Sequence, residues 1–356
     1  MNTQEIIQWL LENGCPTIRY RTVTELMEPD CYNNIDQIVN DLVESQEVKV
    51  WLDNLDPMNV NLRTYHGCAN TCFENSMSKL AQLGMRAGMP ALDERTQPLR
   101  AWLEQMVNAR SDQWDVFALA VFASFFAVAG YTDSAINVFL NSRLQTLYEF
   151  TRSGDYDIYD DTAKYKGVPK AFQGRPIINP SLYVRGNYRY PLLYDVYGLS
   201  TMVNKGDTVV DEKIDTVIKY IMAPEYHQKI ADGYGILAAP NGKYHCMGWD
   251  AKVPGFSGMM EEAKTRGALL IQRMELMAHF PYVAGHAWFA CALGHLETFR
   301  TDSGTYNFPK HYLGEKEGYW VCGMHMGIGE NRRAKIANEL ESTFWMMLIK
   351  KFAGML

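Results

Sequence analysis

The sequence lacks the charge signature of a nucleic-acid-binding protein. Its 356 residues carry 34 Lys and Arg against 41 Asp and Glu, which gives a net charge of −7. Nucleic-acid binders gather basic residues on one face because phosphates repel acidic surfaces. No run of Lys or Arg occurs in this chain. We therefore expect no nucleic acid among its partners.

The sequence also lacks a secretory leader and a run long enough to cross a bilayer. The N-terminus is acidic and amphipathic, with no basic segment ahead of an apolar one. The most apolar stretch, Val116–Ala129, is shorter than the roughly 20 residues that a span requires. Seven scattered cysteines fit reduced thiols better than a disulfide framework. We expect a cytoplasmic protein with no transmembrane segment.

Strand signals are scarce, and helical patterns fill most of the chain. Only residues 208–210 and 319–322 have the composition of short extended segments. Apolar residues recur at helical spacing elsewhere, between Gly, Pro and Asn breaks. The expected helices span residues 3–13, 16–27, 33–45, 70–85, 93–109, 113–129, 132–152, 188–203, 211–222, 260–279, 283–299 and 333–352. The pattern predicts an all-α protein.

The helices also show a weak repeat. Breaks after apolar helices fall near residues 130, 205, 279 and 353, a period of about 75 residues that suggests a repeated unit. Each unit would pair a buried apolar helix with an amphipathic outer one. We expect one domain over residues 1–356, an (α/α)6 toroid of inner and outer helices with long loops on one rim. Its first and last helices would pack together.

Four segments carry a resemblance to a known group: residues 9–26, 73–85, 174–183 and 341–352. In these segments the chain resembles the α/α-toroid repeat proteins. This group includes squalene–hopene cyclase-type domains, protein prenyltransferase β subunits and lanthionine synthetase cyclases. Uncharacterised bacterial prenyltransferase-like proteins look most similar. The resemblance implies a central cavity that binds a largely apolar small molecule. The Asp-x-Asp-Asp motif of class II terpene cyclases is incomplete, because Ile158 replaces its first acid.

Acidic residues supply the first candidate chemistry. The stretch Gly154–Ser200 begins with an acidic loop that contains Asp160 and Asp161. Adjacent carboxylates in a poorly solvated cavity raise the pKa of one another, so either residue is a candidate general acid. Asp195, within an aromatic helix, is the third candidate catalytic residue. The alternatives are a solvated loop and a hydrogen-bonded core acid.

Aromatic residues supply the expected binding surface. Tyr190, Tyr194 and Tyr197 are spaced to share one helical face, and Trp249 precedes a later helix. Aromatic faces hold apolar ligands or stabilise a carbocation. Arg332, in the glycine-spaced segment before the last helix, is expected to contact an anionic group of the substrate. Packing between helices is the alternative for the tyrosines, and a plain flexible loop is the alternative for the segment that contains Arg332.

Thiols and imidazoles suggest a metal site as a further hypothesis. Three groups precede expected inner helices: His66 with Cys68 and Cys72, His245 with Cys246, and Cys322 with His325. Zinc requires three or four such ligands at one point. We expect His245, Cys246, Cys322 and His325 as the ligands of a possible zinc ion. Reduced thiols and core histidines are the alternative.

These patterns favour a terpene-cyclase-like enzyme that acts on a largely apolar small molecule. Acid-initiated cyclisation or isomerisation, without a cofactor, is the concrete form of this hypothesis. One alternative is a zinc-dependent transferase or lyase that activates a thiol. The other is a non-catalytic toroid that binds a peptide or a lipid.

Overall fold

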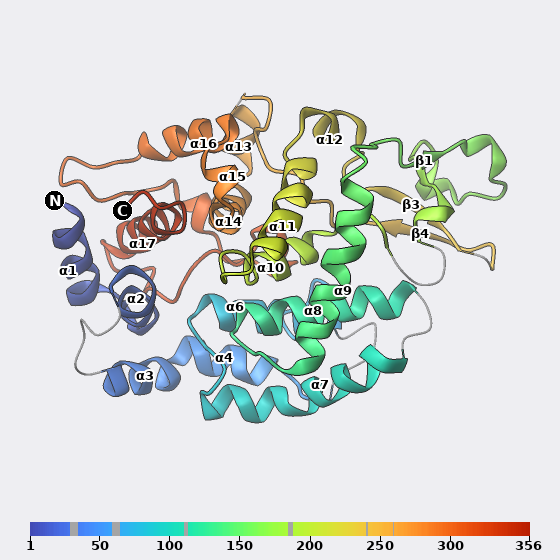
Figure 1. Cartoon of the computed structure of the whole chain (residues 1–356). Coiled ribbons are helices and arrows are strands. Elements are labelled where there is room, and N and C mark those ends of the chain that lie inside the picture. Colours follow the sequence, from blue (N-terminus) through green and yellow to red (C-terminus); the bar gives the residue numbers. More distant parts are fainter. Residues whose placement is uncertain (29–34, 59–64, 110–112, 184–187, 240, 259) are drawn as a thin grey trace. The chain divides into compact units, whose positions relative to one another are not determined.

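The computed structural model describes residues 1–28, 35–58, 65–109, 113–183, 188–239, 241–258 and 260–356 (Figure 1). Contacts divide the chain into two compact units. Unit 1 comprises residues 1–102, 128–131 and 253–356, and unit 2 comprises residues 103–127 and 132–252. The expectation of one domain over the whole chain stays a prediction.

Unit 1 begins with helices that follow the apolar pattern of the sequence. They are α1 (Thr3–Asn13), α2 (Pro16–Arg21), α3 (Ile35–Glu44), α4 (Gln46–Asn54), α6 (Phe73–Gln82) and most of α7 (Pro90–Ala109). The side chain of Asn2 accepts a hydrogen bond from Glu5 N, and the Glu5 carboxylate accepts one from Asn2 N. This capping box explains why α1 has the predicted bounds. The expected cap at residues 33–34 lies outside the described residues.

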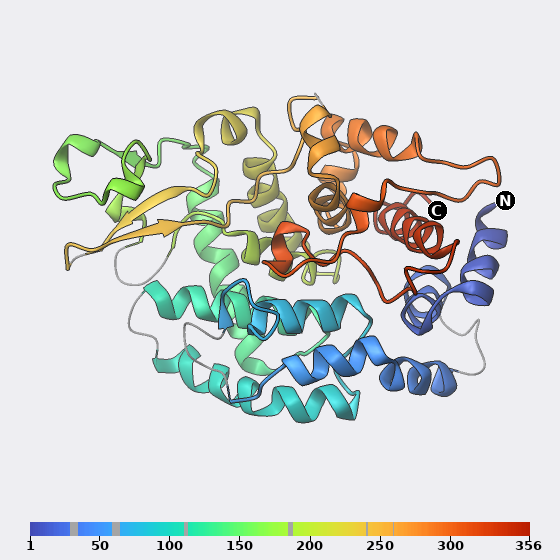
Figure 2. The same ribbon diagram turned by 180° about the vertical axis from the view of Figure 1, so that it is seen from behind.

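The second part of unit 1 contains two largely buried helices among its shorter elements. The helices are α13 (Glu261–Thr265), α14 (Gly267–Ala278), α15 (Pro281–Ala284), α16 (Ala287–Glu297) and α17 (Ala337–Phe352), with short 3-10 turns η6 (Lys310–Leu313) and η7 (Trp320–Cys322). α14 and α17 pack against each other, and α17 also contacts α1 and α2 (Figures 1 and 2). The expected packing of the first helix against the last is therefore present. A Cβ on Gly267 would lie 2.0 Å from the Tyr312 ring, so only glycine fits there.

Unit 2 contains a helical part built around a very apolar helix. Its helices are α8 (Gln113–Val128, except its last residue), α9 (Ser134–Thr151), α10 (Leu193–Ser200), α11 (Thr208–Ile221) and α12 (Pro224–Lys229). α8 is buried from Val116 to Phe126, which confirms the expected buried helix. α9 packs against both α10 and α11. Within the described ranges, no helix has the length and apolar character that crossing a bilayer would demand.

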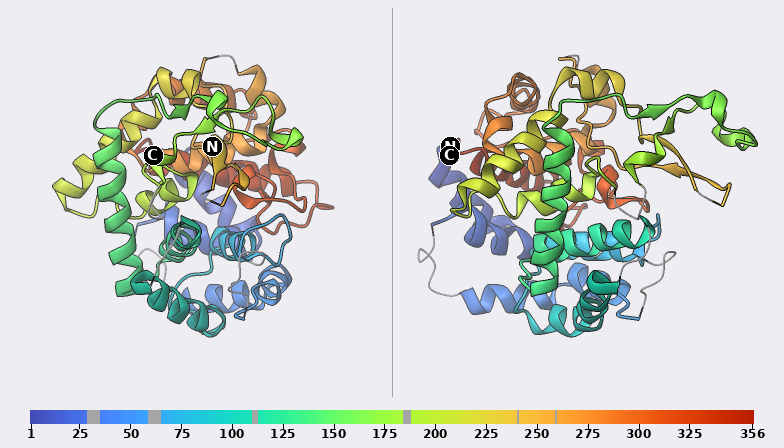
Figure 3. Two further views of the ribbon diagram at one scale, coloured as in Figure 1. Left: turned by 90° about the vertical axis from the view of Figure 1, so that its right-hand side faces the viewer. Right: turned by 45° about the vertical axis from the view of Figure 1, so that its right-hand side comes forward.

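Unit 2 also contains a four-stranded sheet that the sequence analysis did not predict. Its strands are β1 (Tyr159–Asp160), β2 (Ile177–Ile178), β3 (Gly235–Ala238) and β4 (Tyr244–Met247). They lie in the order β1-β2-β3-β4 (Figure 3). β2 and β3 are parallel, and the outer pairs are antiparallel. The expectation of an all-α (α/α)6 toroid is therefore wrong. Strands this short leave no alternating pattern, and Gly233, Gly235 and Gly242 made the hairpin resemble a loop.

Three smaller expectations also need correction. Residues 208–210 begin helix α11, and residues 320–322 form the 3-10 turn η7, so neither segment is a strand. The tyrosine-rich helix begins at Leu193 and not at residue 188, because Pro191 disfavours a helical conformation in the residue before it. Tyr188 and Tyr190 therefore lie ahead of α10.

Candidate functional site

Helix α6 places an unusual number of polar groups in the core of unit 1. Every residue from Phe73 to Gln82 is buried. The buried polar side chains of this helix are Glu74, Asn75, Ser76, Ser78, Lys79 and Gln82. Burying polar groups costs free energy unless each finds a partner, so their partners define the organised part of the unit.

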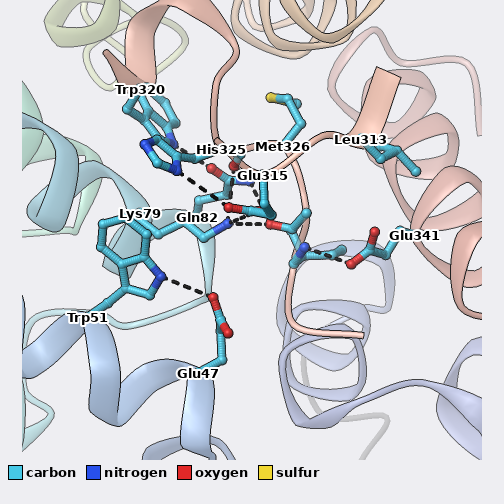
Figure 4. Close-up of polar contacts among 12 residues, drawn as sticks. Glu47, Trp51, Lys79, Gln82, Leu313, Glu315, Trp320, His325, Met326 and Glu341 are labelled. Atoms are coloured by element: carbon cyan, nitrogen blue, oxygen red, sulfur yellow. Dashed lines mark hydrogen bonds and ion pairs between the residues drawn. The ribbon is translucent and has the colours of Figure 1, made fainter. Parts of the chain in front are cut away.

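Lys79 and Gln82 hold the segment from Leu313 to Arg332, which we call the strap. The completely buried Lys79 ammonium lies 2.6 Å from Glu315 Oε1 and donates to the carbonyls of His325, at 3.1 Å, and Gly327 (Figure 4). Gln82 Nε2 donates to the same His325 carbonyl at 2.8 Å. These bonds fix the strap against α6, because releasing it would leave a buried ammonium without its acceptors.

Glu341 of α17 holds the other end of the strap. Its carboxylate accepts from Ile328 N at 2.9 Å and lies 2.6 Å from Arg332 Nη2. Burial raises the pKa of Glu341 to about 7, although Arg332 lowers it. Arg332 also donates to the Leu313 carbonyl at 2.7 Å. The guanidinium that we expected to bind substrate is thus engaged within unit 1, and its substrate-binding role stays a prediction.

His325 lies inside the strap as a buried structural residue. Its Nε2 is 3.0 Å from the Gly318 carbonyl, and its Nδ1 is 3.4 Å from Glu315 Oε2. Its ring meets Trp51 edge-on, with 5.1 Å between the ring centroids. Both ring nitrogens of this expected zinc ligand thus have protein partners.

His66 and Glu74 form a different kind of pair. His66 Nδ1 lies 2.7 Å from Glu74 Oε2. The Glu74 side chain is completely buried, whereas 19% of the His66 side chain is exposed. A carboxylate accepts hydrogen bonds, so we expect neutral His66 to carry its proton on Nδ1. A carboxylate that orients an imidazole in this way is the arrangement of a general base.

Tyr319 lies beside this pair, and three thiols are close to these residues along the chain. The Tyr319 ring is 5.4 Å from the His66 ring, measured between centroids. Burial raises the pKa of Tyr319, and negative charge on Glu74, Cys68, Cys322 and Cys72 raises it further. We call these six residues the His66 site: His66, Cys68, Cys72, Glu74, Tyr319 and Cys322. Because Tyr319 and Cys322 belong to the strap, Lys79 and Glu341 position two of the six residues of this site indirectly.

Asn75 ties the loop before α6 to the strap. Its buried side-chain amide donates to the carbonyls of Gly67 and Ala69, both at 2.9 Å. Its Oδ1 accepts from Trp320 N at 2.8 Å. One amide therefore fixes the backbone on both sides of Cys68 and the turn that follows Tyr319.

Asp160 and Asp161 lie in the acidic segment of unit 2. Asp160 accepts from Lys164 Nζ at 2.5 Å and from Tyr165 OH at 2.8 Å. These bonds lower the pKa of Asp160, which is the opposite of the shift that a general acid requires. Asp161 is exposed and caps the 3-10 turn η2 (Thr162–Lys164) through Ala163 N. Asp161 therefore matches the solvated loop that we considered as the alternative, whereas Asp160 lies in strand β1 with its side chain 19% exposed. The catalytic role of either residue stays a prediction.

Asp195 forms a buried ion pair in unit 2. Its two oxygens lie 2.9 Å and 2.6 Å from Arg143 Nε and Nη2. Leu192 N also donates to Asp195 at 2.8 Å and so caps α10. These contacts match the hydrogen-bonded core acid that we considered as the alternative.

The expected aromatic ligand surface is buried in unit 2. Tyr190, Tyr194 and Tyr197 have almost no exposed surface. Tyr194 packs edge-on against Phe125, with 5.8 Å between the ring centroids. The centroids of the Tyr194 and Trp249 rings are also 5.8 Å apart. Packing accounts for these contacts, and a role in binding substrate stays a prediction.

The four expected zinc ligands are not seen together. His245 and Cys246 are adjacent in β4, so their side chains point to opposite faces of the sheet. They belong to unit 2, whereas Cys322 and His325 belong to unit 1. In the described part of the chain, no three or more His, Cys, Asp or Glu side chains form a group suited to a metal ion. Zinc binding stays a prediction without an assembled set of ligands.

Comparison with known proteins adds no family assignment. No protein-family model, curated protein or solved structure matches the chain. The resemblance to α/α-toroid proteins therefore stays a prediction.

Proposed function

We propose that the protein is an enzyme in which His66 acts as a general base and Glu74 orients it. The 2.7 Å contact between His66 Nδ1 and the completely buried Glu74 carboxylate is the observation that supports this function best. Such a carboxylate fixes the tautomer of the imidazole and stabilises the imidazolium that forms when Nε2 takes a proton. General base catalysis of this kind contributes about 10²- to 10⁴-fold to a rate.

The partial exposure of His66 separates it from the structural histidine of the same unit. His325 is buried within the strap, with both nitrogens bonded to protein groups. His66 keeps 19% of its side chain exposed beside the Tyr319 ring. A substrate with an apolar part can contact that ring while a polar group reaches the imidazole. We therefore propose a small molecule with a removable proton as the substrate class.

A Kemp elimination probe tests the proposed base without knowledge of the substrate. The rate with 5-nitrobenzisoxazole would be measured for the wild type, His66→Gln, Glu74→Gln and a control, His311→Gln. His311 is an exposed histidine of unit 1 whose Nε2 contacts the Lys264 carbonyl at 3.0 Å. We expect at least roughly tenfold loss in His66→Gln and no change in His311→Gln. A His66→Gln rate equal to that of the wild type would refute the proposal.

A second candidate function retains the acid-initiated chemistry but changes the acid. Glu275 of α14 is 20% exposed, and burial raises its pKa to about 7. Nearby Glu25 also raises the pKa of Glu275, whereas Arg21 and Arg86 lower it. Arg21 lies over the Phe344 and Trp345 rings. A carboxylic acid that keeps its proton near neutral pH is suited to start a cyclisation or isomerisation. Glu275 therefore fits the predicted terpene-cyclase-like role better than Asp160, Asp161 or Asp195.

Product analysis separates the two candidate functions. The wild type, Glu275→Gln and His66→Gln would be incubated with a panel of isoprenoid alcohols and diphosphates, and the products separated by gas chromatography. Turnover that is lost in Glu275→Gln and kept in His66→Gln would replace our leading proposal with the second. Turnover that depends on His66 alone would reject Glu275 as the acid.

A further inference from the structure

Three arginine side chains are buried within the described residues. The exposed fractions of Arg21, Arg143 and Arg273 are 4%, 2% and 5%. A guanidinium keeps its positive charge at every accessible pH. Burying that charge costs free energy unless an anion lies beside it and its N–H groups find acceptors. The partners of the three guanidinium groups therefore show whether each charge is balanced within the chain.

Arg21 and Arg143 share one pattern of contacts. Arg21 Nη1 donates to the Gln82 carbonyl at 2.9 Å, and Nη1 of Arg143 likewise donates to a backbone carbonyl. The other side of each guanidinium, formed by Nε and Nη2, contacts a carboxylate. This carboxylate belongs to Glu25 beside Arg21 and to Asp195 beside Arg143. In both pairs an acid on the Nε–Nη2 side balances the buried charge.

Arg273 of α14 has the first half of this pattern and lacks the second. Its Nη1 donates to the Val321 carbonyl in the strap at 3.1 Å. Its Nε is buried and has no hydrogen-bond partner. Within the described residues, no Asp or Glu side chain forms an ion pair with this guanidinium. The Nε–Nη2 side of Arg273 is therefore a place for a carboxylate that the described chain does not supply.

The surroundings of Arg273 restrict the chemistry of its missing partner. Residues three and four positions away share its face of the helix, and all of them are buried and apolar: Leu269, Leu270, Leu276 and Met277. One guanidinium balances one negative charge, so a monoanion fits this apolar setting better than a doubly charged phosphate or sulfate. The setting favours a single carboxylate attached to an apolar body.

We propose that unit 1 binds a small monocarboxylic acid with an apolar body, and that its carboxylate occupies the Nε–Nη2 side of Arg273. The planar guanidinium fork holds the two oxygens of a carboxylate side by side. The bond from Nη1 to Val321 stays in place, so the ligand balances the charge and stabilises the strap. The proposed role of His66 is not needed for this binding, and the Kemp elimination probe tests it separately.

The experiment titrates the full-length protein with sodium benzoate and sodium hexanoate by calorimetry, in a buffer without other carboxylates, sulfate or phosphate. We expect one bound acid per chain and a rise of roughly 2 °C or more in melting temperature at saturation. Sodium sulfate and sodium phosphate should bind at least roughly tenfold more weakly. Tighter binding of either inorganic anion would overturn the carboxylate assignment. Absence of binding by both acids at about 10 mM would overturn the whole proposal.

Variants of Arg273 test whether its fork holds the carboxylate. Arg273→Lys keeps the positive charge but loses the fork, so benzoate should bind at least roughly tenfold more weakly. In Arg273→Met, benzoate should no longer raise the melting temperature. The control Arg333→Gln alters an exposed arginine of the same unit and should bind benzoate like the wild type. Wild-type binding by Arg273→Lys, or wild-type stabilisation of folded Arg273→Met, would reject Arg273 as the site.

Nitrogen-15 NMR of arginine-labelled protein locates the bound acid directly. The Nε–H signal of Arg273, assigned by its absence in Arg273→Lys, should shift when benzoate binds, because Nε then donates a charge-assisted hydrogen bond. The signals of Arg21 and Arg143 should stay in place, since carboxylates of the chain already contact their Nε atoms. A benzoate complex in which the Arg273 signal does not move would place the ligand elsewhere and overturn the proposal.

Discussion

Each unit of the protein contains a helix with a completely or nearly completely buried carboxylate, and the two carboxylates have different partners. Asp195 in unit 2 contacts Arg143, and each side chain is only 3% exposed. Glu74 in unit 1 contacts His66, which is partly exposed. A guanidinium keeps its charge at every accessible pH, whereas an imidazole gains and loses a proton near neutral pH.

The comparison shows that burial of an acid does not by itself indicate catalysis. Asp195 forms two bonds with a permanent cation and caps α10, so its contacts serve the fold. Glu74 bonds to a group that can transfer a proton and reach solvent. We therefore infer structure from the first pair and chemistry from the second. The following predictions test this contrast, beginning with the largest expected effect on stability.

Removing the charge of Asp195 should cause the largest loss of stability. Asp195→Asn leaves the buried Arg143 guanidinium without its counter-ion, which should lower the free energy of unfolding by about 3–5 kcal/mol. Urea denaturation followed by circular dichroism measures this change. The double variant Arg143→Met, Asp195→Leu should recover much of the loss. A loss below about 1 kcal/mol for Asp195→Asn would show that the ion pair does not hold unit 2 together.

Removing the Lys79 ammonium should have a somewhat smaller effect. Lys79→Met leaves the His325 and Gly327 carbonyls short of a donor, while Glu315, 37% exposed, can regain water. We expect a loss of about 2–4 kcal/mol in unfolding free energy and a slower Kemp elimination, because the strap positions Tyr319. The control Lys335→Met alters an exposed lysine of the same unit and should change stability by less than about 0.5 kcal/mol. An unchanged elimination rate in folded Lys79→Met would show that the strap does not influence the His66 site.

The buried Glu341 should make stability depend on pH in a defined direction. Its pKa rises from an ordinary 4.5 to about 7 on folding, so the native state binds more protons than the unfolded state between these values. The free energy of unfolding contributed by Glu341 therefore falls as pH rises through this window. Relative to the wild type, Glu341→Gln should gain about 3 kcal/mol between pH 4.5 and pH 7. Parallel stability curves for the two proteins would contradict the raised pKa.

Replacing His66 should have the smallest effect on stability and a large effect on activity. The amide of His66→Gln can still donate to Glu74, so we expect a change of less than about 1 kcal/mol. The Kemp elimination rate should nevertheless fall at least roughly tenfold. If His66→Gln instead destabilised the protein as strongly as Asp195→Asn, the two buried pairs would serve the same structural purpose.

Helices with strong periodicity were predicted well, and short strands were not. Thr3–Asn13 has a capping residue and a regular apolar face, so its bounds followed from the sequence. The segment after Ser45 was missed as a helix, although Ser45 caps α4 and four of the nine residues of α4 are apolar. β1 and β2 contain two residues each, which is too few to show the alternation by which strands are identified.

The site was predicted only in part because its contacts join distant segments. His66, Cys68 and Cys72 were grouped by composition, but no spacing rule connects His66 to Glu74 across the turn before α6. Lys79 resembles a solvated lysine of an amphipathic helix, yet its partner Glu315 lies 236 positions later in the chain. Asp195 attracted attention as an acid among aromatic residues, and its partner Arg143 has no sequence signal either. Local patterns identify reactive residue types, whereas their partners depend on tertiary packing.

The most direct test of the contrast between the two buried pairs is the tautomer of His66. Nitrogen-15 NMR of histidine-labelled protein distinguishes protonated from unprotonated ring nitrogens, and His66→Gln assigns the signal. We predict that neutral His66 carries its proton on Nδ1, bonded to Glu74, with Nε2 unprotonated, and that Glu74→Gln weakens this preference. A neutral His66 with its proton on Nε2 would contradict the account, because that imidazole could not accept a proton at Nε2.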